Sequence, residues 1–143
     1  MERSIVAFSS KEDSQEAFNE ITEKIDSVGI SPIAIIFFSD CDRFWFFSKY
    51  LHEKYTETAS IGSTTYVNFS SDNNSINSSN DSLSSKYGVT ALAIFSGIEV
   101  SFGCLFEIDR HPKNYKSHIT QALNSLTSYE NTCCLEFSTA FSM

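Results

Sequence analysis

Hydroxyl and carboxylate side chains follow three short apolar segments of the sequence. The segments are Ile5–Phe8, Ile33–Phe38 and Thr58–Ile61. If they form parallel strands, their carboxyl ends meet at one edge of a sheet, where α/β proteins commonly bind ligands. The polar residues expected to gather at that edge are Ser9, Ser10, Ser39, Asp40, Asp42, Gly62, Ser63, Thr64 and Thr65.

This set of side chains suits a small zwitterionic ligand such as an amino acid. Backbone N–H groups at helix N-termini favour a carboxylate, and aspartate favours an ammonium group. The alternative is that these serine, threonine and aspartate residues act only as helix caps and turn residues, which any α/β protein shows at such points. Both interpretations explain the residue types, but only the first predicts a ligand.

Two helices are expected between the three strands. Ser10 is a suitable N-cap for the first, and Gly29 can adopt a left-handed conformation at its end. The second spans residues 43–55, and Asp40 or Asp42 can cap it. Its aromatic stripe is expected to face the core. That stripe comprises Phe44, Phe47, Leu51 and Tyr55, widened by Trp45 and Phe46.

The second half of the sequence predicts a hairpin, a helix and a last strand. Residues 88–95 form an apolar run and residues 99–108 alternate, so a turn between them predicts an antiparallel pair. A helix is expected to start at Asn114 or Tyr115, and residues 132–137 to form the final strand. Both follow from the apolar periodicity.

Residues 68–85 are dominated by serine, asparagine and aspartate, and are expected to form a mobile surface loop. The whole pattern predicts an α/β fold with a mixed β-sheet of about six strands and about three helices. The predicted order is βαβαβ, a two-stranded hairpin, then αβ. No glycine triplet follows the first strand, so a dinucleotide-binding unit is not expected.

Length and composition limit the classes of protein. A chain of 143 residues predicts a single domain, and 41% hydrophobic residues with 13 phenylalanines indicate a globular one. A net charge of −8 argues against nucleic acid as a partner, because that binding needs a basic face. The sequence contains no apolar segment of membrane-spanning length and no secretory signal pattern. We therefore expect no membrane insertion and a cytoplasmic location.

No motif in the sequence indicates catalysis. The four cysteines lack the spacing of a zinc site, and His111 and His118 match no metal pattern with them. Cys41 lies between two aspartates, and His52 is the nearest histidine in sequence. A thiol hydrolase would need these two side chains within hydrogen-bond reach. The expectation is a non-catalytic protein without a metal or cofactor, whose cysteines are reduced thiols.

Two motifs resemble the N-terminal half of a FIST domain. They are Phe37–Asp42, with the sequence Phe-Phe-Ser-Asp-Cys-Asp, and Ile61–Thr65, with the sequence Ile-Gly-Ser-Thr-Thr. The segment Cys134–Phe141 resembles the same half-domain at the front of soluble bacterial methyl-accepting chemotaxis proteins. The FIST family is a sensory α/β module of bacterial receptors and some F-box proteins. In this chain Val67 and Asn68 replace a Gly-Glu pair that is usual in the family.

The resemblance implies a sensory domain for chemotaxis or signal transduction. Such a domain would bind a small ligand, amino acids being the class associated with the family, and pass its state to a downstream signalling domain. That domain would follow Met143 in a longer parent chain, with residues 132–137 as the output element. The alternative is a protein–protein interaction scaffold without a small ligand, as in the F-box relatives. The replacement of the Gly-Glu pair favours this alternative.

Overall fold

The structure of the protein is a computed structural model that describes residues 3–65, 68–70, 83–85, 88–101, 112–127 and 135. The chain forms two compact units, residues 1–98 and 99–143, and the expectation of a single domain stays a prediction. Each unit is described by itself. The fold is a mixed α/β fold with three helices among the described residues, as the sequence predicts.

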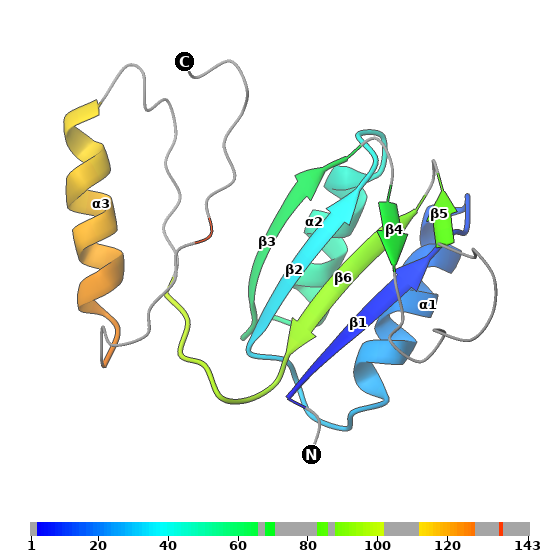
Figure 1. The fold of residues 1–143 in the computed structure, drawn as a ribbon, viewed down its shortest axis with the longest axis horizontal. Coiled ribbons are helices and arrows are strands. Elements are labelled where there is room, and N and C mark those ends of the chain that lie inside the picture. Colours follow the sequence, from blue (N-terminus) through cyan, green and yellow to red (C-terminus); the bar gives the residue numbers. More distant parts are fainter. Residues whose placement is uncertain are drawn as a thin grey trace. The chain divides into compact units, whose positions relative to one another are not determined.

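A four-stranded sheet forms the first unit (Figure 1). Its strands lie in the order β1 (Ser4–Ser9), β6 (Val89–Ile94), β2 (Ala34–Ser39) and β3 (Ala59–Thr64). β6 is antiparallel to both β1 and β2, and β2 is parallel to β3. β1, β2 and β3 therefore run in the same direction, and their carboxyl ends lie at one edge, as expected from the sequence.

Two helices, α1 (Ser14–Asp26) and α2 (Phe44–Lys54), lie on the same face of this sheet (Figure 1). The chain moves across the sheet in one direction from β1 to β2 to β3, and right-handed connections then place both helices on one side. The direction of travel does not reverse between these strands. The sheet therefore lacks, among β1, β2 and β3, the reversal that opens the binding crevice of doubly wound folds.

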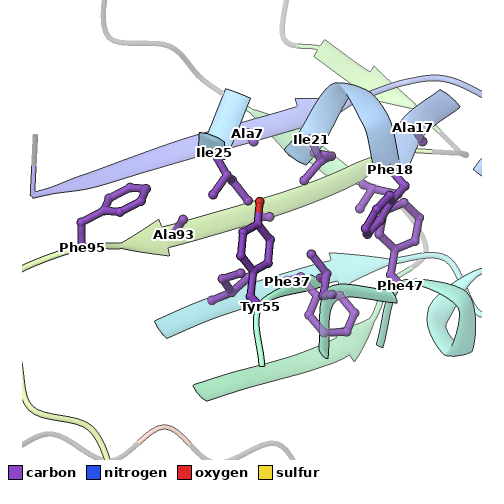
Figure 2. Close-up of a cluster of buried hydrophobic side chains, with 14 residues drawn as sticks. Ala7, Ala17, Phe18, Ile21, Ile25, Phe37, Phe47, Tyr55, Ala93 and Phe95 are labelled. Atoms are coloured by element: carbon purple, nitrogen blue, oxygen red, sulfur yellow. The ribbon is translucent and has the colours of Figure 1, made fainter. Parts of the chain in front are cut away.

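The core lies between the two helices and the sheet, as Figure 2 shows. β2 supplies Ile35 and Phe37, and the neighbouring β6 presents small residues, Ala91 and Ala93. These small side chains leave room for the aromatic side chains of the helices. The helix residues of the cluster are Ala17, Phe18, Ile21, Ile25, Phe47, Leu51 and Tyr55.

β3 continues through the segment that the sequence predicted to be a turn. Gly62 and Ser63 lie inside the strand, paired with Phe37 and Phe38 of β2. The six residues of β2 form a full parallel ladder with β3, so the strand does not end at Ile61. Gly62 makes this possible, because a Cβ there would overlap the ring of Phe37. The glycine therefore permits a close approach within the core.

The opposite face of the sheet carries an apolar row across all four strands. The registers align Val6 with Leu92, Leu92 with Ile36, and Ile36 with Ile61. The two ends of the row are exposed, Val6 by 44% and Ile61 by 37%. Within the described residues of the first unit no helix covers this face, and β4 (Asn68–Ser70) approaches it at β1 and β6.

Three local predictions for the helices need correction. The N-cap of α1 is Asp13 and not Ser10, because Asp13 Oδ1 accepts hydrogen bonds from the N–H groups of Gln15 and Glu16, each at 2.9 Å. Gly29 is left-handed as expected, with φ of 80°. α2 begins after Arg43, and Trp45 is 78% exposed because it points away from the buried face of Phe47.

The strands beyond β3 also differ from the predicted order. β4 pairs in antiparallel fashion with β5 (Leu83–Ser85) as a separate two-stranded sheet, so the ends of the expected surface loop are strands. Residues 71–82, the middle of that loop, lie outside the described residues. Residues 99–101 are not in a strand, and the remainder of the expected hairpin strand, 102–108, lies outside the described residues.

The second unit contains α3 (Pro112–Asn124), which begins two residues before Asn114 because proline fits the first turn of a helix. The turn after α3 contacts the start of the unit. Glu99 Oε2 accepts hydrogen bonds from the N–H and hydroxyl of Thr127, at 3.0 and 2.5 Å. Both bonds hold the pKa of Glu99 below its ordinary value. The expected final strand, residues 132–137, lies outside the described residues except for Leu135, which is not in a strand.

A polar contact joins the ends of α1 and α2 in the first unit. The Tyr55 hydroxyl donates to Asp26 Oδ1 at 2.8 Å, and Lys54 Nζ lies 2.8 Å from Asp26 Oδ2. Burial raises the pKa of Tyr55 far above its usual value, and the hydrogen bond and negative charge of Asp26 raise it further. Tyr55 therefore stays protonated in the folded protein at a pH where it ionises in the unfolded chain.

Gly62→Ala should destabilise the protein by about 1–3 kcal/mol, because the new methyl group must displace the Phe37 ring from a close-packed core. Urea denaturation measures the change in the free energy of unfolding. Ser63→Ala, one residue along on the other face of β3, serves as the control and should have little effect. Combining Gly62→Ala with Phe37→Leu should cost less than the sum of the two single changes. If the two changes in the free energy of unfolding simply add, the close contact between Gly62 and the Phe37 ring is contradicted.

Tyr55→Phe should make the stability less sensitive to alkaline pH. The stabilisation from Tyr55 is complete below its unfolded pKa of about 10 and is lost as the pH rises above that value, since only the unfolded chain then releases the proton. Urea denaturation between neutral pH and pH about 11 should show the wild type falling more steeply than the variant. Tyr50→Phe, at a more exposed ring on the same helix, is the control. Parallel curves for wild type and Tyr55→Phe would contradict the expectation.

Candidate functional site

The carboxyl edge of the sheet brings the ends of β1, β2 and β3 together. Ser9 at the end of β1 pairs with Val89, and Ser39 at the end of β2 pairs with Thr64. The N–H of Thr65 donates to the Ser39 carbonyl at 2.8 Å, which holds the chain after β3 beside β2. We call this edge the rim.

Arg43 connects two of the turns at the rim. Its Nε donates to Asp40 Oδ2 at 2.6 Å, and its backbone N–H donates to Asp40 Oδ1 at 3.0 Å. Its Nη1 donates to the carbonyl of Lys11 at 2.7 Å, in the turn between β1 and α1. The residue is only 6% exposed, so this is a largely buried cation that joins two segments far apart in the sequence.

The polar network continues from Lys11 into α1. The Lys11 N–H donates to Ser9 Oγ at 3.3 Å, and the Ser9 hydroxyl donates to Glu20 Oε2 at 2.6 Å. Ser9 is almost fully buried at 1% exposure. A continuous series of hydrogen bonds therefore runs from Asp40 through Arg43, the Lys11 backbone and Ser9 to Glu20. Such networks restrain all the elements that contribute to them.

Two buried polar atoms in the described part of the chain have no hydrogen-bond partner, Arg43 Nη2 and Thr90 Oγ1. Asp40 bonds the Nε and the backbone N–H of Arg43 through different oxygens, so it does not form the two-point pair that would also engage Nη2. Thr90 lies on the other face of the sheet, paired with Phe8 and Phe38. Unpartnered buried donors are rare in native proteins and often mark a functional position.

A shallow, open depression of about 360 Å³ lies over α1 beside the network. Three carboxylates and one amine face it, and its lining residues are Lys11, Glu16, Asn19, Glu20 and Glu23. Lys11 Nζ lies 3.9 Å from Glu16 Oε2 in an exposed ion pair, which contributes little to stability. The surface here is net acidic and therefore favours a cationic group over an anion.

The predicted site residues divide into three groups. Ser9 and Asp40 belong to the polar network, and Ser39 is fully buried beside them with its hydroxyl bonded to the Asp40 carbonyl at 3.1 Å. Ser10, Asp42 and Thr64 also lie at the rim and are exposed, and Thr65 is held beside β2 by its bond to the Ser39 carbonyl. Gly62 and Ser63 lie within β3 on opposite faces and do not reach the rim.

Arg43, Lys11 and Glu20 were not among the predicted site residues. One feature of the sequence could have indicated the role of Arg43. It is a cation at the start of a helix, where the helix dipole disfavours positive charge. Such a residue needs a strong local reason, and here Asp40 supplies it. The bonds to Lys11 and Glu20 leave no comparable pattern in the sequence.

The other candidate chemistry does not converge in the described residues. Cys41 is an exposed free thiol in the turn before α2, and His52 is exposed on that helix. His111 lies outside the described residues, as does the side chain of His118. No group of three metal-ligating side chains occurs in the part of the chain that the structure describes. Within the same residues, none of the helices has the length and hydropathy of a membrane span.

The comparisons with known proteins assign no class. No family model, curated protein or solved structure matches this chain. The fold and the rim define the molecule as a mixed α/β protein with a buried arginine network at the carboxyl edge of its sheet. The resemblance to the FIST family stays a prediction from the two short motifs.

Asp40→Ala should destabilise the protein by about 3 kcal/mol, because it leaves the buried Arg43 guanidinium without its counter-charge. Asp42→Ala, two residues along and exposed, should change the free energy of unfolding by less than about 0.5 kcal/mol. Urea denaturation of both variants compares the two aspartates directly. Equal effects would mean that Asp40 acts only as an exposed turn residue.

Proposed function

We propose that this chain is a non-catalytic sensory module. It binds a small ligand, an amino acid in the simplest case, at the rim and relays its state to a downstream signalling domain in a longer parent chain. The ligand occupies the region where the turns after β1 and β2 approach each other. This proposal combines the FIST resemblance with the arrangement of the polar groups at the rim.

One observation carries the proposal: the buried Arg43 joins the two turns at the carboxyl edge. A buried ion pair is weak evidence for stability, since apolar residues of similar volume often serve a fold as well. Arg43 lies at the carboxyl edge of the sheet, which supports a role in recognition even without the strand-order reversal of doubly wound folds. The carboxylates of the adjoining depression add a place for the ammonium group of a zwitterion.

A relay of the ligand's state requires two arrangements with different affinities for the ligand. The network from Asp40 to Glu20 supplies a means, because it ties the turn before α2 to the turn before α1. A ligand that forms hydrogen bonds with any of these groups changes the connection between the two turns and shifts the equilibrium between the two arrangements. The proposed signalling domain reads the shift through the element that contacts it.

A second candidate function is a protein–protein interaction scaffold without a small ligand. The apolar row across the sheet favours it, because Val6 and Ile61 are exposed at its two ends. Exposed apolar surface of this kind marks interaction sites. If this candidate is right, the chain should self-associate or bind a partner through the row, and Leu92→Ser should weaken that association.

Thermal unfolding of the full chain with each common amino acid in turn tests the sensory function. A ligand that binds only the folded state at about one hundred times its Kd adds about 2.7 kcal/mol of stability, which raises Tm by several degrees. At least one amino acid should give a saturable rise. No rise with any of them, together with association that increases with protein concentration, would favour the scaffold and contradict the sensor.

A further inference from the structure

The Nη2 atom of Arg43 is a charged donor that nothing in the described chain uses. We propose, building on the function proposed above, that Arg43 is the residue that receives the carboxylate of the ligand, with Nη2 as the donor. The inference names both the ligand's chemical class, a carboxylate, and the side chain that recognises it.

The geometry of the guanidinium accounts for the unused position. Nε and Nη2 lie along one edge of this planar group and usually bind the two oxygens of one carboxylate together. Asp40 supplies only one oxygen to that edge, because its other oxygen accepts the backbone N–H of Arg43. One donor of a two-point carboxylate site is therefore unused at a residue that is only 6% exposed.

The N-terminus of α2 adjoins this position and also favours an anion. Arg43 is itself the N-cap residue, and no side chain caps the helix. The first turn of α2 contains no acidic residue, so no carboxylate of the helix offsets its dipole. The helix N-terminus therefore adds a favourable potential for an anion near the turn that holds Arg43.

Binding of a carboxylate at Nη2 affects the connection that Arg43 makes between the turn before α2 and the turn before α1. Nη2 is closed to solvent, so a carboxylate reaches it only when a neighbouring segment shifts. Nη1 of the same guanidinium donates to the Lys11 carbonyl, so the turn between β1 and α1 is tied to the group that receives the ligand. Its movement passes through the Lys11 backbone to Ser9 and Glu20, which links recognition to the position of α1.

Sodium acetate is the probe for the test, with sodium chloride at equal ionic strength as its reference, and the full 143-residue chain is used. The chain has three arginines, so the side-chain Nε–H of Arg43 is readily assigned by NMR. Acetate should shift this signal in a saturable way, and chloride should not. Trp45, the single tryptophan and two residues from Arg43, gives a second readout by fluorescence.

Arg43→Lys is the informative variant, because it keeps the positive charge and removes Nη2. Acetate affinity should fall about tenfold or more, as expected for the loss of a hydrogen bond to a charged group. Arg3→Lys makes the same chemical change at an exposed arginine and should leave acetate binding unchanged. If Arg43→Lys does not fold, the acetate-dependent shift of the Arg43 Nε–H in the wild type remains a complete test.

The outcomes separate this inference from the proposed function. Acetate binding that depends on Arg43 supports the inference whether or not any amino acid binds. An amino acid that binds the wild type and Arg43→Lys equally would overturn the inference and leave the sensory function standing. No acetate-dependent shift of the Arg43 Nε–H would also overturn it.

Discussion

The position of β6 between β1 and β2 is the constraint on which the rest of the molecule depends. An antiparallel strand in that place makes β1 and β2 run in the same direction, and it separates them by about 10 Å, twice the usual strand spacing. The turns that follow them therefore end at one edge with the start of β6 between them. A long side chain is needed to join those turns, and Arg43 does so by reaching the Lys11 carbonyl.

The same topology explains why the two faces of the sheet differ. Successive right-handed connections place α1 and α2 together, so one face is buried against aromatic and branched side chains (Figure 2). The other face receives no helix from the described part of the first unit, and its strands still present an apolar row from Val6 to Ile61. The proposed sensory function and the alternative scaffold function would thus use different surfaces, the rim and the open face of the sheet.

The regular elements of the first unit could be predicted from the sequence because their signals are local. The run from Ile33 to Phe38 predicts β2 to within one residue at each end, whereas the cap of α1 lies three residues after the predicted Ser10. The turn expected at Gly62 was wrong for a physical reason, since Ile-Gly-Ser-Thr-Thr has turn residues and only the ring of Phe37 explains the glycine. That ring lies 25 positions earlier in the sequence, the difference between 62 and 37, and no local pattern reports it.

The residues of the candidate site that lie at strand ends could be predicted from the sequence, but the long-range contacts between them could not. The direction of the strands and the presence of Ser9 and Asp40 at the rim follow from the pattern of strands and helices. Arg43 could be noted from the sequence only as a cation at a helix start, because its bond to Lys11 spans 32 residues. Arg43 is a candidate functional residue because it is buried, since an exposed arginine at the same position would be an ordinary solvated charge.

The stability lost by burying an unpartnered donor bears on whether Arg43 has only a structural role or also a role in recognition. If Arg43 served only to hold two turns together, a fully satisfied guanidinium would do so better, because each unpartnered buried donor lowers stability. The structure instead gives one oxygen of Asp40 to the backbone of Arg43 and leaves Nη2 without an acceptor. A fold that depends on local consistency tolerates such a mismatch chiefly where another molecule completes it. The unused Nη2 is therefore the feature of the rim that the proposed recognition of a carboxylate would account for.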